Sequence, residues 1–255
     1  MKKLLGKKCI FVVLAVLLAF WWGSACAPRQ EVQELRVFAA ASLRDPMNNV
    51  ISKFQEKEKN VKVIANYDAS GKLYTQIKEG QPCDLFFSAD WKYIEKGLQE
   101  GKLAEGRKWL KEKLVLVVSA GGRDKVKTVE DLAKPGVTVA IADPKAPVGI
   151  YSERALMKAL GIWDKVEKNI KARPGTVQDA AVLVKENQVD ATLIYTSVAK
   201  QHGLTPIQVI EERYSGEILF GVGIVKGGKE ALAKKFLEFC QQNLGEFTKY
   251  GWEAP

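Results

Sequence analysis

Histidine is nearly absent from this chain, since His202 alone occurs among 255 residues. Zinc sites of the common spacings need several histidine or cysteine ligands, and a Ser-His-Asp arrangement needs a histidine base. His202 precedes Gly203, where a surface helix is predicted to end, so a position at a helix C-terminus is the simpler interpretation. Asp84, Asp90 and Asp143 lack the spacing of a known metal site. The sequence therefore disfavours an enzyme, and neither a cofactor nor a metal-ion site is expected.

Cysteine is also scarce, and a basic stripe with interleaved aromatic residues is missing. Cys9 and Cys26 lie near the N-terminus, which leaves Cys83 and Cys240 for the folded part. In an exported protein these two form either a disulfide or two buried free thiols. The formal net charge is +9, with positive and negative residues interspersed. Nucleic acid is therefore not expected as a partner.

The first apolar run, at 10–22, is too short for a comfortable transmembrane helix, which needs about 20 residues. Four lysines precede it and small residues follow, so residues 1–25 are predicted to be a signal peptide, with an uncleaved anchor helix as the alternative. The small residues before Cys26 resemble the bacterial lipoprotein signal, although Gly23 stands where leucine is usual. Lipid chains on Cys26 would hold the protein at the outer face of the cytoplasmic membrane, whereas plain cleavage would leave it in the periplasm.

Strand-like and helix-like segments alternate along the rest of the chain. Short apolar runs predict strands, and apolar residues recurring every three or four positions predict helices. The predicted strands are 35–40, 61–67, 84–88, 113–119, 137–142, 191–195 and 218–225, and the predicted helices are 47–54, 73–77, 91–99, 150–160, 176–186 and 230–244. This order predicts an α/β fold with doubly wound, mainly parallel sheets.

Two α/β blocks joined by two long apolar runs predict two lobes with a ligand cleft between them. The first lobe is predicted to contain 33–117 and 219–255, and the second to contain 118–218. Such a cleft can close on a ligand by hinge motion.

Four predicted strand-to-helix junctions gather small residues, hydroxyls, glycine and proline. They lie at 39–42, 68–71, 143–151 and 174–177. The first N–H groups of a helix have no partner within it, and the helix dipole is positive there, so such junctions bind anions without arginine or lysine. Serine at a helix start is more often a plain N-cap, which remains the alternative for each junction taken alone.

The chain resembles the molybdate-binding proteins of ABC transporters, the ModA type. The resemblance covers nearly all of the exported part, in order, and is carried by VFAAASL at 37–43, ASGKLYTQIKEGQPCDLFFSAD at 69–90, LVLVVS at 114–119, DPKAPVGIYSERAL at 143–156 and LIYTSVA at 193–199. It implies a two-lobed type II periplasmic-binding-protein fold, with two doubly wound mixed sheets and a ligand cleft between them. It also implies that the protein captures molybdate, and tungstate closely behind, for a permease and an ATPase. A monomer is expected.

The resemblance also implies which residues hold the ligand. Ser42 and Ser70 would each offer a hydroxyl and a backbone N–H from the first lobe. Val148 and Val177 would offer backbone N–H groups from the second. Tyr195 would offer its phenolic O–H, although taken alone it would be interpreted as a core aromatic residue.

Four positions depart from the family pattern. Cys83 replaces the usual alanine, Val198 stands where aspartate is frequent, and Val148 stands where a smaller alanine is common. Asp68 lies two residues before Ser70, where a small residue is usual. If its carboxylate reached the site it would repel a dianion and accept a proton from hydrogen phosphate, but a position away from the ligand or a turn cap is expected.

The sequence leaves other ligands and other classes of function open. Sulfate is smaller than molybdate, so donors fixed by two lobes would not all reach it, and an unpaired buried donor costs about 1–3 kcal/mol. Phosphate and arsenate carry a proton at neutral pH that needs an acceptor. Two alternatives come from other classes of protein. One is a sensor subunit, and the other is an exported α/β enzyme acting on a phosphorylated compound.

Overall fold

The computed structural model describes residues 31–254, and one compact unit begins at Gln33. The predicted signal peptide and Cys26 lie outside the described residues, so both stay predictions. Among the residues described, no helix combines the length and the apolar character needed to cross a membrane.

The first lobe is built on a five-stranded sheet in the order β2-β1-β3-β10-β4. β1 runs parallel to β2 and β3, whereas β10 runs antiparallel to β3 and β4. The strands are β1 (Gln33–Ala40), β2 (Val61–Asp68), β3 (Leu85–Ser88), β4 (Leu103–Glu112) and β10 (Ile218–Val225). The helices are η1 (Ala41–Leu43), α2 (Arg44–Lys57), α3 (Ser70–Lys78), α4 (Trp91–Gln99), α10 (Glu230–Gln242) and α11 (Gly245–Thr248).

The second lobe repeats this plan with the order β7-β6-β8-β5-β9, in which β6 is parallel to β7 and β8 and β5 is antiparallel to β8 and β9. Its strands are β5 (Leu114–Val118), β6 (Val139–Ala140), β7 (Ile170–Ala172), β8 (Ala191–Tyr195) and β9 (Gln208–Val209). Its helices are η2 (Val129–Ala133), α5 (Pro147–Arg154), the π-helical η3 (Ala155–Ala159), α6 (Trp163–Asn169), α7 (Val177–Lys185), α8 (Thr196–Gln201) and α9 (Glu212–Ser215).

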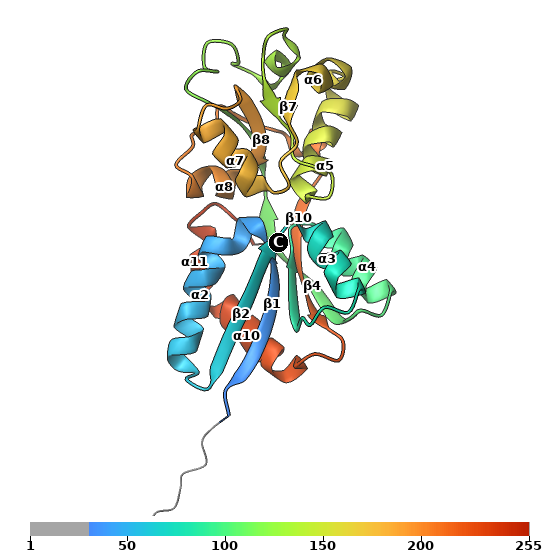
Figure 1. The fold of residues 1–255 in the computed structure, drawn as a ribbon, viewed down its shortest axis with the longest axis vertical. Helices are drawn as coiled ribbons and strands as arrows, with labels where there is room; N and C mark the ends of the chain where they lie inside the picture. Colours follow the sequence, from blue (N-terminus) through green and yellow to red (C-terminus); the bar gives the residue numbers. More distant parts are fainter. Residues whose placement is uncertain (1–30, 255) are drawn as a thin grey trace, which may run out of the picture. The chain divides into compact units, whose positions relative to one another are not determined.

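Apolar composition decides which strands are central. β3, β5 and β8 are buried at every residue because both faces of each sheet are covered by helices. In Figure 1, α2 and α11 lie on one side of the first sheet and α3 and α4 on the other. The side chains of β1 point alternately to the two faces of the sheet. Leu35 and Val37 belong to the core cluster with Met47 of α2, whereas Phe38 packs with Leu73 of α3 on the other face.

The structure confirms the predicted α/β class with two mixed sheets but corrects one boundary. The predicted lobe boundary after residue 117 placed most of β5 in the first lobe, and that assignment is wrong because β5 pairs with β8 and β9. The chain crosses between the sheets at Lys113, since β4 ends at Glu112 and β5 begins at Leu114. Cys83 and Cys240 are both buried free thiols, so the disulfide alternative is excluded.

Candidate functional site

A small cavity lies where the carboxyl ends of parallel strands from both sheets meet, which is where open α/β sheets bind ligands. Its volume is about 20 Å³, taken as the space open to the centre of a water molecule. Residues of both lobes line it: Ala40, Ala41, Ser42, Asp68, Ala69, Ser70, Ala89, Ala146, Pro147, Val148, Thr176, Val177 and Tyr195. All five residues predicted to hold the ligand are among them.

The first lobe contributes two buried serines. Ser42 lies in η1 directly after β1, is 1% exposed, and its Oγ has no hydrogen-bond partner among the described residues. Ser70 is the first residue of α3, is 0% exposed, and its Oγ accepts a hydrogen bond of 2.9 Å from the Ala89 N–H. A hydroxyl that accepts one bond still has its own hydrogen to donate, so Ser70 can donate into the cavity while its oxygen is held in place.

The second lobe contributes the beginnings of two helices. Val148 follows Pro147 in the first turn of α5, whose N-cap is Ala146, a residue without a side-chain acceptor. Val177 begins α7, and the Thr176 side chain caps that helix by accepting from a later N–H. The N–H groups of Val148 and Val177 have no acceptor within their helices because they belong to the first turn. Both helices therefore direct backbone donors and the positive ends of their dipoles toward one point.

Tyr195 completes the lining from the carboxyl end of β8. The side chain is 1% exposed, and within residues 31–254 its Oη has no hydrogen-bond partner. Burial raises the pKa of Tyr195 well above its ordinary value, so the phenol stays protonated and can act only as a neutral donor or acceptor. Its ring packs edge-on against Phe220 at a centroid distance of 5.7 Å, which holds the hydroxyl in position. Because a buried hydroxyl without a partner is costly, Ser42 and Tyr195 together indicate a ligand position.

One acidic residue is also among the residues that line the cavity. Asp68 was expected to point away from the ligand or to cap a turn; its Oδ1 accepts from the Ala69 N–H at 2.7 Å, at the turn before α3. Lys72, one turn further along α3, places Nζ 3.3 Å from the same oxygen. The lysine offsets the negative charge of Asp68, which reduces the repulsion that an anion in the cavity would meet.

The lining suits a small, fully ionised anion. Its residues include neither lysine, arginine nor histidine, and its polar groups other than Asp68 are hydroxyls and backbone amides. If the cavity is treated as a sphere, its radius is about 1.7 Å, on the order of the distance from the central atom to an oxygen in a tetrahedral oxyanion. The arrangement can surround such an anion with neutral hydrogen bonds, and small side chains such as those of Ala40 and Ala41 let it approach the backbone.

The lobes are in direct contact beside the cavity. The Gly71 N–H donates to the Lys145 carbonyl oxygen at 3.3 Å. A Cβ on Gly71 would lie 2.6 Å from that oxygen and 2.7 Å from the Tyr93 hydroxyl, so a side chain there would hold the lobes apart.

Gly149 is confined within the second lobe, because a Cβ on it would lie 2.4 Å from the Ala142 carbonyl oxygen.

Other residues considered from the sequence have structural partners. The carboxylate of Asp84 accepts from the backbone N–H groups of Arg36 and Lys229, Asp90 caps α4, and Asp143 accepts from a nearby backbone N–H. Within the part of the chain that the structure describes, no group of three or more histidine, cysteine or carboxylate side chains is placed to hold a metal ion.

The departures at Val198 and Cys83 lie away from the cavity lining. Val198 is buried in α8, and Cys83 packs against the α3 and α4 face of the first sheet. Thr176, Ala89 and Ala146 line the cavity although they were not predicted as ligand residues. In the sequence, Ala146 and Thr176 fall within two of the predicted junctions, and Ala89 directly follows the predicted strand at 84–88.

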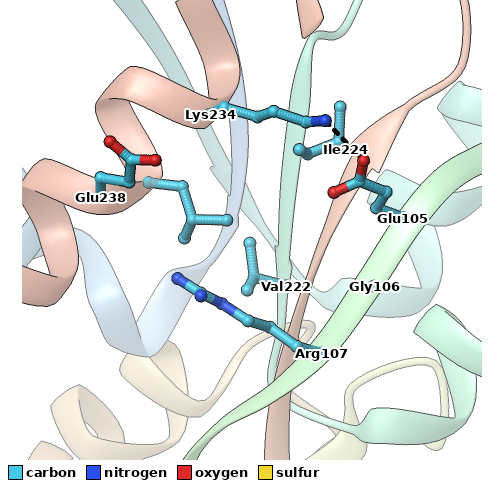
Figure 2. Close-up of a pocket in the computed structure, with 8 residues that line it drawn as sticks. Glu105, Gly106, Arg107, Val222, Ile224, Lys234 and Glu238 are labelled. Carbon is cyan, nitrogen blue, oxygen red and sulfur yellow. Dashed lines mark ion pairs between the residues drawn. The ribbon is translucent and has the colours of Figure 1, made fainter. Parts of the chain in front are cut away.

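A larger pocket, of about 220 Å³ by the same measure, lies on the first lobe and shares no residue with the cavity. Figure 2 shows its lining from β4, β10 and α10: Glu105, Gly106, Arg107, Val222, Ile224, Lys234, Leu237 and Glu238. Lys234 pairs with Glu105 at 2.5 Å, and a second carboxylate, Glu238, stands nearby. Its mixed charges and apolar strand residues do not form a donor cage for an anion.

Comparison with known proteins agrees with this fold. Residues 35–253 match the family described as bacterial extracellular solute-binding protein. The molybdate-binding protein ModA of Escherichia coli (strain K12) is 30% identical over 230 residues, covering 86% of this chain and 88% of that protein. The putative ABC transporter substrate-binding lipoprotein YvgL of Bacillus subtilis (strain 168) is 29% identical over 261 residues, covering 95% and 97%.

The likeness extends to solved structures. The periplasmic molybdate-binding protein of Azotobacter vinelandii matches with a TM-score of 0.76 at 23% identity, covering 87% of this chain and 99% of that chain. At this identity the match speaks for the fold, and it confirms the two-lobed periplasmic-binding-protein architecture predicted from the sequence.

Proposed function

Because the chain belongs to the bacterial extracellular solute-binding protein family, we propose that it captures molybdate, and also tungstate, for an ABC importer. In this proposal the anion binds in the small cavity between the lobes. Ser42, Ser70 and Tyr195 donate from side chains, and Val148 and Val177 donate from backbone N–H groups. The anion is then released unchanged to a permease driven by an ATPase.

One observation carries this proposal. Five residues chosen from five separate stretches of sequence line a single cavity, and two of their hydroxyls, on Ser42 and Tyr195, are buried without partners among the described residues. Each unpartnered buried hydroxyl costs about 1–3 kcal/mol, and these two differ from the other unpartnered buried groups of the described residues because they line the cavity. A dianion with four acceptor oxygens would satisfy them together.

The donor set bears on which anion binds. Molybdate and tungstate are fully ionised at neutral pH and need only donors. Hydrogen phosphate carries a proton that requires an acceptor, whereas the other polar side chains of the lining are hydroxyls, and Asp68 Oδ1 is engaged by Lys72 and the Ala69 N–H. Sulfate is ionised but smaller, so donors fixed on two lobes would reach it incompletely. The name of the Escherichia coli relative, a molybdate-binding protein, supports the same choice.

The place of the protein in the cell is part of the proposal. We propose that residues 1–25 are removed during export and that acylated Cys26 anchors the protein at the outer face of the membrane. The name of the relative in Bacillus subtilis, a substrate-binding lipoprotein, supports this proposal. If Cys26 is not acylated, cleavage leaves a free periplasmic monomer.

Calorimetric titration of residues 27–255 with molybdate, tungstate, sulfate and phosphate tests the ligand. Tight one-to-one binding of the first two without heat from the others is expected. Heat from sulfate or phosphate instead would mean that the same fold serves another tetrahedral oxyanion. Recovery of chemically unchanged molybdate after incubation separates a receptor from an enzyme, because an enzyme would consume its ligand.

A further inference from the structure

Two glutamines of the second lobe reach across the cleft to the first. Gln178, in the first turn of α7, donates from Nε2 to the Ala41 carbonyl oxygen at 3.3 Å. Gln201, the last residue of α8, donates from Nε2 to the Ser42 carbonyl oxygen at 2.9 Å. Both acceptors lie in η1, the loop that carries one of the two serines of the cavity. Neither glutamine lines the cavity itself.

The two amides and the single histidine form one directional network. Gln178 Nε2 also donates to Gln201 Oε1 at 2.9 Å, and His202 Nε2 is hydrogen bonded to Gln178 Oε1. Because Nε2 of each amide is a donor here, Gln178 Oε1 must accept, which assigns the hydrogen of His202 to Nε2. Each side chain is only half-buried, so its orientation is set by these bonds rather than by packing.

The bond to Ala41 has a consequence for the anion donors. The Ala41 carbonyl and the Ser42 N–H belong to one planar trans peptide, in which they point in opposite directions. The Ala41 carbonyl also accepts from the Arg44 N–H within the first lobe, so the bond from Gln178 adds to the restraint on this carbonyl and hence on the direction of the Ser42 N–H. It also polarises the peptide, which strengthens that N–H as a donor.

We propose that Gln178 and Gln201 form an amide latch that holds the two lobes closed and sets the orientation of η1 (Ala41–Leu43), the anion loop that carries Ser42. They are positioning residues, since they act on the ligand through the Ala41–Ser42 and Ser42–Leu43 peptides. On opening, the two carbonyls and both amides exchange these bonds for water, so the latch favours the closed state by only a modest amount.

The closure part of the latch does not depend on the identity of the ligand, whereas the loop-orienting part rests on the proposed function. The Gly71 to Lys145 bond joins the lobes at another point of the cavity rim, where α3 faces the turn before α5. The latch joins η1 to α7 and α8. Removing the latch therefore leaves one rim contact in place and weakens closure without abolishing it.

The test replaces both latch residues by methionine, which keeps the length of the side chain and removes the amide. The matched control is Gln76→Met, because Gln76 is also half-buried but accepts its hydrogen bond from Asn66 within the first lobe. For each protein, over residues 27–255, we would measure the molybdate dissociation rate by stopped-flow tryptophan fluorescence. The radius of gyration without ligand, by small-angle X-ray scattering, is the second readout.

The double variant Gln178→Met/Gln201→Met should release molybdate roughly 10- to 100-fold faster than wild type, and its ligand-free radius of gyration should increase. The control should match wild type in both readouts, and both variants should still unfold in a single cooperative thermal transition without ligand. Unchanged dissociation together with unchanged scattering in the double variant would overturn the latch.

If wild type binds neither molybdate nor tungstate, the proposed function fails, and the ligand-free scattering alone then decides whether the latch exists.

Discussion

The substitution Tyr195→Phe separates a ligand donor from a core aromatic residue, because the two roles predict opposite results. The change removes one oxygen, and the ring can keep its edge-on contact with Phe220. In the ligand-free protein the lost hydroxyl has no hydrogen-bond partner. The free energy of unfolding should therefore stay unchanged or rise by up to about 1 kcal/mol, since an unsatisfied buried group has been removed.

The affinity of the Tyr195→Phe variant for molybdate should fall. A hydrogen bond to a charged group contributes about 1.5–3 kcal/mol, so molybdate should bind roughly 10- to 150-fold more weakly to the variant. Isothermal titration calorimetry gives the dissociation constant, and urea unfolding without ligand gives the stability. The loss should not depend on pH between 6 and 9, because burial raises the pKa of Tyr195 far above that range.

The matched control is Tyr74→Phe. The Tyr74 hydroxyl donates to Glu100 at 2.8 Å and lies outside the cavity, so that variant should lose stability and keep its affinity. Wild-type affinity in Tyr195→Phe would refute the role of the phenol as a ligand donor. Loss of folding in Tyr195→Phe would show that the hydroxyl has a structural partner.

Three further predictions concern the serines, the buried carboxyl at the lobe crossing and the rim. Ser42→Ala should weaken molybdate binding without changing the stability of the protein. Ser70→Ala should weaken binding and also destabilise the protein by about 1–3 kcal/mol, because it leaves the Ala89 N–H unpaired. Calorimetry and urea unfolding check both variants, and wild-type affinity in both would refute the site. Burial raises the pKa of Glu112 from 4.5 to about 7, so the protonated carboxyl is favoured in the folded state and stability should fall as pH rises from 4.5 to 7. Glu112→Gln should remove that slope and gain roughly 3 kcal/mol at pH 8 in urea unfolding, and an unchanged slope would contradict the assignment. Gly71→Ala should weaken molybdate binding at least tenfold with little loss of stability, because its Cβ would collide with the Lys145 carbonyl on closure; equal affinity by calorimetry would show that the rim tolerates a methyl group.

Much of the fold could be predicted from local pattern. The predicted bounds of α4, β8 and β10 coincide with those observed, because an amphipathic period or an uninterrupted apolar run marks elements whose surroundings are uniform along their length. By contrast β4, at Leu103–Glu112, was not predicted. It is an edge strand with five consecutive exposed residues, and a polar edge carries no apolar pattern. β7 and α6 were missed because three and seven residues are too short for a period to emerge.

The site divides in the same way. The sequence by itself determined the junction chemistry, because serine, glycine and proline at a helix start act through backbone N–H groups only a few residues away. It also determined the two-lobed class, through the order of its elements. Only the tertiary structure placed Asp68 in the lining beside Lys72, assigned β5 to the second sheet, and brought Gln178 and Gln201 to the carbonyls of the first anion loop. The two glutamines lie more than 130 residues from those carbonyls along the chain, and a half-buried glutamine has no sequence pattern that names its partner. Contacts between distant segments depend on how two lobes meet, and that is decided by packing of the whole chain rather than by any local stretch of it.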